Sequence, residues 1–255
     1  MPAVFESIGK YLRQYANKDG RGYPDWAMRY APVARMVHRM NSTNAPILEV
    51  GANENGIARF VHARIVAVDV SPDHLRAARR TQGVSVVVAD AAALPFANGT
   101  FAASVCMDTL EHIPEAKRAR VCDELVRTVS RTGFSVVAFP SGRAAERAEI
   151  SIRSAHARFN GGNIPWLDEH EEEGLPDPNG LAEHLLETLD STRTVCCTQN
   201  ANVYVWRAMW RVLGCGWPGR GNAVFQAAVR FLTPLLTRIH VGPCYRSMIW
   251  ITPRS

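Results

Sequence analysis

The chain has 255 residues, 47% of them hydrophobic, and a formal net charge of +5. This length and composition predict one well-packed α/β domain with insertions, and exclude a chain that crosses a membrane, because no window reaches the ~18 uncharged apolar residues that a spanning helix needs. The amino end has no apolar stretch typical of a secretory signal and the six cysteines form no CxxC pair, so we expect a cytoplasmic protein with reduced thiols.

Residues 1–45 predict a helical cover ahead of the domain. Apolar residues recur at three- and four-residue steps along its second part, as on one face of a helix. They are Trp26, Tyr30, Val33, Val37 and Met40. We expect this face to pack on a sheet.

Residues 47–70 predict two strands with a tight turn between them. Ile47 to Val50 form a short apolar run, Gly51 to Asn55 a polar turn, and Ile65 to Asp69 a second apolar run that ends in an acid, with a helical segment expected from Gly56. Such a turn points backbone N–H groups at one spot, beside an acid that can bind ribose hydroxyls. The stretch therefore predicts a nucleoside site at the switch point of a doubly wound sheet.

The pattern continues to residue 140. A short helix follows Ser71 and Pro72, and a strand at 84–90 ends in Asp90. Further strands are expected at 101–108 and 133–139, with a helix at 114–130 between them. Strands of about six apolar residues that alternate with helices predict a Rossmann-like α/β fold with a doubly wound, mostly parallel sheet.

The pattern changes after Pro140. Residues 141–178 are expected to form a long acceptor-side loop, followed by a helix at 180–189 that Asp177 or Asn179 could cap. Strands at 192–198 and 245–252 complete a seven-stranded sheet, with a helical insertion at 201–243 between them. We assign residues 46–255 to a single domain behind the helical cover.

The order of these motifs resembles that of the class I S-adenosylmethionine-dependent methyltransferases, of the type 11 small-molecule kind. In that family the first-strand acid and glycine turn hold the methionine part of the cofactor, matching Glu49 and Gly51 here. The second-strand acid binds the ribose, matching Asp69, and the third-strand acid binds the adenine amino group, matching Asp90. The resemblance therefore implies S-adenosyl-L-methionine as cofactor. It implies these cofactor-binding residues: Glu49, Gly51, Asn53, Asp69, Val70, Asp90, Ala91 and Met107.

The chain departs from the family in its turn, where the pattern acid-x-Gly-x-Gly-x-Gly becomes Glu49-x-Gly51-x-Asn53-x-Asn55 with Gly56 one place late. Asparagine tolerates left-handed backbone best among the other residues, so the shape of the turn survives. The alternative is a non-catalytic cofactor-binding or interaction protein. A second rival, an NAD site, fits Gly51, Gly56 and Asp69 but lacks the middle glycine and gives Asp90 no role.

The segment MDTLEHIP (107–114) follows the fourth strand and carries the candidate catalytic residues. We expect His112 to act as a base, supported by Glu111 and Asp108, on a hydroxyl acceptor. The spacing is similar to the acid-x-x-Glu-His of ubiquinone-biosynthesis O-methyltransferases, where the segment has been implicated in divalent metal binding. We assign no metal from the sequence. The alternative role for His112 is packing and hydrogen bonding.

The acceptor is expected to meet the acidic stretch WLDEHEEEGLPDP within 141–178. Trp166, Asp168, Glu169 and His170 could contact it there, and the alternative is a solvated acidic turn. The resemblance and the absence of a (Asp/Asn)-Pro-Pro-(Tyr/Phe) motif favour O-methylation of a small-molecule, glycan or lipid-linked acceptor.

The charges are unevenly divided, which bears on partners. Residues 191–255 contain eight arginines and no acid, whereas residues 1–190 have a net charge of −3. Within 201–243 two stretches carry apolar faces alternating with arginines, as helices on anionic lipid do. These stretches are open to two interpretations, peripheral contact with the inner membrane face or a helical cap packed on the domain. RNA methylation, with arginines on phosphates, is a further alternative.

Overall fold

The computed structural model describes residues 23–39, 45–52, 56–159, 162–212, 232 and 235–254. Its strands are β1 Ile47–Val50, β2 Ile65–Asp69, β3 Val84–Val88, β4 Phe101–Met107, β5 Val129–Pro140, β6 Arg193–Asn202 and β7 Cys244–Pro253. Its helices are α2 Tyr23–Arg39, α3 Pro72–Ala78, α4 Glu115–Arg127, α5 Gly142–Phe159, α6 Pro165–Glu173, α7 Pro178–Thr188 and α8 Val203–Val212, with 3₁₀ turns η1 Ile57–Arg59 and η2 Leu110–His112.

The sheet has seven strands in the order β3-β2-β1-β4-β5-β7-β6, which confirms the predicted Rossmann-like sheet. Strands β1 to β5 are parallel, and β7 runs antiparallel to both β5 and β6. Because the order reverses between β1 and β4, their carboxyl ends open a crevice at the switch point. The polar residues after β1, β2, β3 and β4 therefore share one edge of the sheet.

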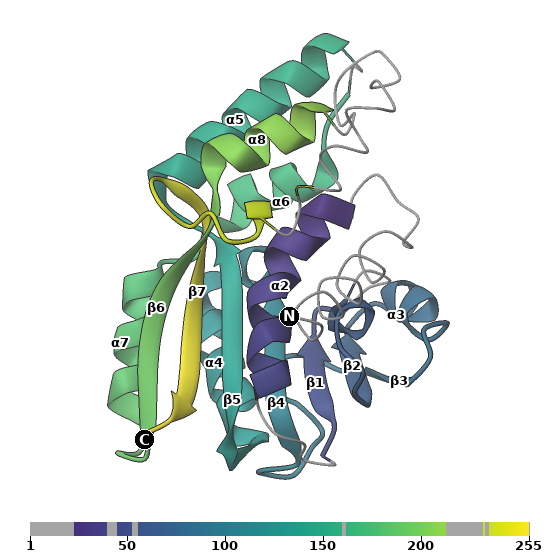
Figure 1. The fold of residues 1–255 in the computed structure, drawn as a ribbon, viewed down its shortest axis with the longest axis vertical. Coiled ribbons are helices and arrows are strands. Elements are labelled where there is room, and N and C mark those ends of the chain that lie inside the picture. Colours follow the sequence, from purple (N-terminus) through teal and green to yellow (C-terminus); the bar gives the residue numbers. More distant parts are fainter. Residues whose placement is uncertain are drawn as a thin grey trace, which may run out of the picture.

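Helices cover both faces of the sheet, with α2 in front and α4 and α7 behind (Figure 1). Alternate strand residues enter two cores, as strand geometry requires. Val105 and Val136 pack with Tyr30 and Val33 of α2, as predicted for this face, whereas Met40 and residues 1–22 of the predicted cover lie outside the described residues. On the other side, Val137 and its neighbours pack with α4 and α7.

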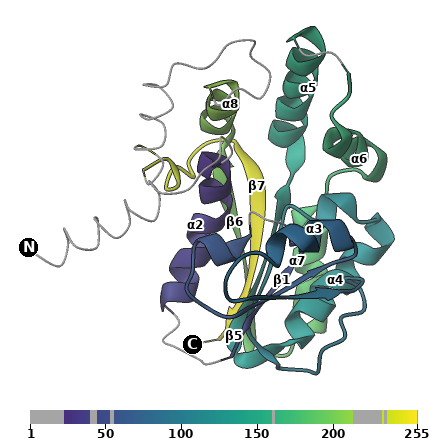
Figure 2. The ribbon, with the colours of Figure 1, turned by 90° about the vertical axis from the view of Figure 1, so that its right-hand side faces the viewer.

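A third group of helices, α5, α6 and α8, stands above the carboxyl edge of the sheet (Figures 1 and 2). We call these three helices the cap. They share a core of their own, which includes Ala148, Leu167, Trp206 and Tyr245. The expected long loop at 141–178 is thus a helix pair. Its apolar positions in α5 are largely alanines, so the hydrophobic signal there is weak.

Local predictions hold in part. Asp177 caps α7 by accepting hydrogen bonds from the N–H groups of Asn179 and Gly180. Ser71 precedes α3 but makes no side-chain cap bond. The helix expected from Gly56 is only the turn η1, because residues 51–64 must also return the chain to the start of β2.

The basic insertion is described in part. The apolar side chains of Val203 and Trp206 in α8 are buried in the cap core, so for this helix the structure agrees with a packed cap. The second amphipathic stretch, 222–240, lies mostly outside the described residues. Within the part of the chain that the structure describes, no helix is long and apolar enough to cross a membrane.

Candidate active site

The turn after β1 requires glycine at its first position. Gly51 has φ +74°, a conformation that L-residues with a side chain rarely adopt. A Cβ there would also lie 2.0 Å from Oγ1 of Thr109. The Thr109 hydroxyl contacts the carbonyls of Val50 (3.5 Å) and Met107 (3.2 Å), so it ties the ends of β1 and β4 together. Gly51 lets these two strand ends approach each other.

Glu49 holds the far side of the turn. Its carboxylate is 3% exposed and accepts a hydrogen bond of 2.8 Å from the N–H of Ile57. Burial raises the pKa of Glu49 to about 7, although this bond and one from Tyr30 work in the opposite direction. A Cβ on Gly56 would meet this carboxylate at 2.3 Å. The Glu49 carboxylate therefore fixes the turn by binding the backbone N–H of Ile57. Asn53, another expected cofactor residue, lies outside the described residues.

Asp69 stands at the tip of β2, in register beside β3. Its Oδ1 accepts a hydrogen bond from the N–H of Ser71 (2.7 Å) and lies 3.4 Å from Nδ1 of His74. Its Oδ2 has no hydrogen-bond partner among the described residues. The next side chain, Val70, is 66% exposed, an unusual state for a large apolar group at a sheet edge. The tip of β2 thus offers an acceptor beside an open apolar surface.

Asp90 lies just beyond β3, at the neighbouring strand end. Val88 pairs with Asp69, and the N–H of Ala89 donates to the carbonyl of Asp69 (3.2 Å). The N–H of Ala92 and, next, the ammonium of Lys117 (3.1 Å) lower the pKa of Asp90. Asp90 is therefore an exposed, ionised group on the same edge of the sheet as Asp69.

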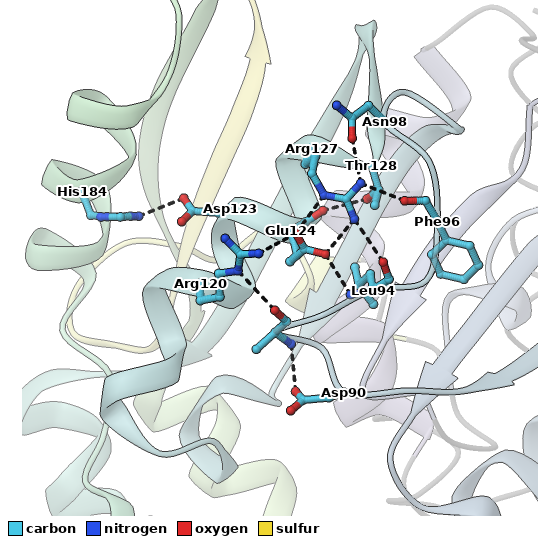
Figure 3. Close-up of polar contacts among 11 residues, drawn as sticks. Asp90, Leu94, Phe96, Asn98, Arg120, Asp123, Glu124, Arg127, Thr128 and His184 are labelled. Carbon is cyan, nitrogen blue, oxygen red and sulfur yellow. Dashed lines mark hydrogen bonds and ion pairs between the residues drawn. The ribbon is translucent and has the colours of Figure 1, made fainter.

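A clamp from α4 fixes the loop that carries Asp90, and sequence reasoning missed it. Arg127 donates to the carbonyls of Leu94 and Phe96 and to the side chain of Asn98, while its guanidinium pairs with Glu124 (Figure 3). Glu124 is buried and accepts a bond of 2.8 Å from the N–H of Leu94. An i, i+3 acid–arginine pair on a helix is a weak sequence signal, because most such pairs are solvated.

These strand ends suit a nucleoside cofactor. The glycine turn leaves no room for a side chain, and Asp69 presents an unpartnered carboxylate oxygen at the position where a ribose binds in this fold. Exposed Val70 and Val88, on adjacent strands, offer apolar surface for a base. Ala91 and Met107, two further expected cofactor residues, follow β3 and end β4, and both are buried.

The end of β4 differs from the sequence-based prediction at Asp108. Arg246 of β7 binds both carboxylate oxygens of Asp108 through its Nε (2.7 and 2.8 Å), and Arg29 of α2 lies 3.1 Å away. Burial works to raise the pKa of Asp108, but the two guanidinium groups outweigh it and the pKa is lowered. Asp108 has φ +49° and is held in this ion cluster. It contacts arginines rather than supporting His112.

His112 contacts the cap instead. Its Nδ1 lies 2.5 Å from Oε2 of Glu169 on α6, and its ring centroid lies 4.8 Å from that of His170. Burial and the neighbouring His170 lower the pKa of His112. Glu111 is 1% exposed, and burial, followed by the charge of Asp108, raises its pKa. Two expected acceptor residues and two expected catalytic residues thus meet in one cluster.

Of the other expected acceptor residues, Trp166 lies edge-on to His170, with ring centroids 5.2 Å apart. Asp168 is paired with Arg153 of α5, away from His112, so the structure does not bring it into the cluster. His170 is oriented by a residue that the sequence did not suggest: its Nδ1 lies 3.0 Å from Oε1 of Glu149. The hydroxyl of Tyr245 donates to the same oxygen at 2.7 Å.

The missed residues Arg29, Glu149, Tyr245 and Arg246 come from elements far apart in sequence. Arg246 and Tyr245 lie in β7, whose apolar pattern predicted a strand but gave no reason to single out two of its side chains. Only the order of the strands, which puts β7 beside β5, brings them to the end of β4.

Comparison with known proteins finds a methyltransferase domain within the chain. Residues 47–133 match the model of a family described as a methyltransferase domain. The matched segment contains Glu49, Asp69, Asp90 and the cluster residues Glu111 and His112. None of the curated protein sequences is significantly similar to the chain.

Solved structures share the fold at low identity. A protein from Pyrococcus horikoshii OT3 is 16% identical, with 96% of this chain and 99% of that one covered and a TM-score of 0.54. A SAM-dependent methyltransferase from Archaeoglobus fulgidus is 12% identical, with 95% of this chain and 98% of that one covered and a TM-score of 0.52. A phosphoethanolamine N-methyltransferase 2 of Haemonchus contortus, solved with S-adenosyl-L-methionine, is 13% identical. The match covers 88% of this chain and 53% of that one, with a TM-score of 0.53. The family match identifies residues 47–133 as a methyltransferase domain, and the solved structures show that the chain shares the fold of such proteins.

Proposed function

We propose that this methyltransferase transfers the methyl group to an oxygen atom of a small-molecule, glycan or lipid-linked acceptor. In this proposal Asp69 binds the ribose hydroxyls, Asp90 the adenine amino group, and Val70 the face of the base. Gly51, with Asn53, accommodates the methionine part, and Glu49 keeps the turn in shape. The unpartnered Oδ2 of Asp69 and the exposed Val70 support this arrangement.

The observation that carries the choice of oxygen is the cluster of Glu111, His112 and His170 between η2 and α6. It lies after β4, next to the strand that begins the cofactor edge, and under the cap. The side chain of His112 is 30% exposed, whereas the other two are buried, so an acceptor would meet His112 first. Imidazole and carboxylate groups are needed for an acceptor that must lose a proton, such as a hydroxyl.

Each part of the site has its own role in the proposed transfer. S-adenosylmethionine, when bound, supplies an electrophilic methyl group on its sulfonium. The cap and η2 hold the acceptor oxygen in line with that group and exclude water, which accounts for most of the rate in such transfers. The cluster takes the proton of the hydroxyl, with Glu169 orienting His112 and Glu149 orienting His170. Asp108 and its two arginines position η2.

The test is transfer from S-adenosylmethionine carrying a ¹³C-methyl group to fractions of small molecules, glycans and lipids. We expect a labelled product whose methyl carbon has the chemical shift of an O–CH₃ group, and its formation should fall at least about 100-fold in His112→Gln, within the 10²–10⁴-fold range of general acid–base catalysis. A product with an N–CH₃ or C–CH₃ signal would contradict the assignment to oxygen.

A lipid-linked acceptor would place the cap on an anionic surface, and we propose this as the site of contact. Tyr204, Leu235 and Val241 are exposed apolar side chains in or near the cap, in a segment whose only charged residues are arginines. Such a surface binds anionic lipid and releases it as salt rises. Sedimentation with vesicles containing phosphatidylserine, at low and high salt, tests this; absence of binding at low salt would contradict it.

A further inference from the structure

Three potential metal ligands converge where the cap meets η2. Glu111 and His112 belong to η2, and His170 belongs to α6. One ligand atom from each, a carboxylate oxygen and two imidazole nitrogens, lies within 4.8 Å of the other two. Ligand atoms around a tetrahedral metal with bonds of ~2.1 Å are about 3.4 Å apart, so an inward movement of α6 on the order of 1 Å would close the site.

Two of these side chains are buried with an atom that lacks a partner. Among the described residues, Oε2 of Glu111 and Nε2 of His170 have no hydrogen bond, although the residues are 1% and 5% exposed. The other oxygen of Glu111 lies 4.0 Å from Nε2 of His170, too far for a hydrogen bond. Leaving such a group unsatisfied costs ~1–3 kcal/mol. Two such groups facing each other indicate that a polar ligand belongs between them.

Carboxylates also occupy the opposite nitrogens of both imidazoles. Glu149 lies at Nδ1 of His170 and is itself held by Tyr245, while Glu169 lies at Nδ1 of His112. Each ring thereby keeps Nε2 for another partner. This carboxylate–histidine arrangement is the one that surrounds metal-bound histidines, where it fixes the ring and raises its basicity.

We infer that Glu111, His112 and His170 form a binding site for a divalent transition-metal cation, with open coordination positions on the solvent side of His112. Two imidazoles and one carboxylate suit Zn²⁺, Fe²⁺ or Co²⁺ rather than Mg²⁺ or Ca²⁺, which prefer oxygen ligands. Asp108 is excluded from the set because Arg29 and Arg246 bind it. The ligand that completes the site comes from the cap, so metal binding would join α6 to η2.

The inference goes beyond methyl transfer, and its test needs neither cofactor nor acceptor. Metal-free protein without an affinity tag is titrated with Zn²⁺ by calorimetry, and with Co²⁺ by visible absorption. We expect one tight site per chain. Affinity should fall at least about 100-fold in His170→Gln and Glu111→Gln, and 10–100-fold in Glu149→Gln, which removes only the carboxylate behind the ring.

His184→Gln is the matched control, because His184 also pairs with a carboxylate (Asp123, 2.9 Å) but lies on α7, outside the cluster. It should leave the affinity unchanged. If the buried variants fail to fold, His112→Gln replaces a more exposed ligand and should also lose the site. The inference would be overturned if the wild-type protein bound neither Zn²⁺ nor Co²⁺, or if a folded His112→Gln variant bound them with equal affinity. The group between Glu111 and His170 would then be a water or the acceptor itself. The ¹³C experiment above is read from the methylated atom of the wild-type product, so its outcome and the metal titration can each fail alone.

Discussion

At the scale of single residues, Glu49 makes stability depend on pH. Its pKa is about 7 in the folded chain and ~4.5 when unfolded. The unfolded chain therefore releases this proton at lower pH than the folded one, and stability without cofactor should fall between pH ~4.5 and 7 and then level off. The loss is on the order of 3 kcal/mol. Urea unfolding of wild type and Glu49→Gln at pH 5 and pH 8 measures it.

Glu49→Gln should gain stability relative to wild type as the pH rises across this range, because its amide cannot ionise. Equal pH dependence of the two proteins would show that Glu49 is not buried as the structure has it.

Gly51 provides a second test at this scale. Gly51→Ala combines left-handed backbone strain of ~1–2 kcal/mol with overlap against Thr109. We expect unfolding free energy to fall by about 3 kcal/mol. Because Gly51→Ala/Thr109→Gly removes the overlap, the double variant should lose less than the sum of the single variants. Strict additivity in this double-mutant cycle would argue against the contact.

At the scale of elements, α4 should stabilise the loop after β3. Arg127→Met removes its bonds to that loop and leaves the buried Glu124 without its main cation. We expect a loss of about 2–3 kcal/mol in chemical unfolding, because hydrogen bonds to charged groups are the strong ones.

The control for this clamp is Arg120→Met on the same helix. Arg120 is largely exposed, and its contacts are weaker: one long hydrogen bond to the carbonyl of Ala92 (3.3 Å) and a distance of 3.7 Å to Glu124, so its loss should change stability by less than about 0.5 kcal/mol. Similar losses for the two variants would mean that the loop does not depend on Arg127.

Much of the sheet could be predicted from the sequence, because buried parallel strands read as short apolar runs between helices. The strands at 84–90 and 245–252 were expected within a few residues of β3 and β7. The cap could not be predicted in this way, because α5 buries Ala145 and Ala148, whose small side chains give little hydrophobic signal for a helix.

The site likewise contains residues that the sequence predicts and residues that only the fold reveals. Asp69 and Asp90 follow strands, so sequence order alone puts them at one edge. The Asp-x-x-Glu-His spacing predicts Asp108 as a partner of His112. Its true partner Arg246 is 138 residues away, and only the packing of β7 reveals it. The same holds for Glu149 and His170, 21 residues apart on two cap helices.

At the scale of the whole molecule, the proposed function assigns the cofactor and the acceptor to two clusters on one sheet edge. The ends of β1, β2 and β3 suit the cofactor, and η2 with the cap suits the acceptor. The Thr109 hydroxyl, between the ends of β1 and β4, lies at their junction. In this proposal the cofactor side is built on strand ends, and the acceptor side is completed by helices far along the sequence.

The most direct test of this arrangement is calorimetric titration of S-adenosylhomocysteine, the demethylated cofactor product, into wild type, Asp69→Ala and Asp73→Ala. Asp73 is an exposed acid on α3, four residues away, paired with Arg76. Loss of two hydrogen bonds to a carboxylate, each worth ~1.5–3 kcal/mol, predicts at least about 100-fold weaker binding for Asp69→Ala with an unchanged fold, and wild-type binding for Asp73→Ala. Wild-type affinity in Asp69→Ala would contradict the cofactor site at the strand ends.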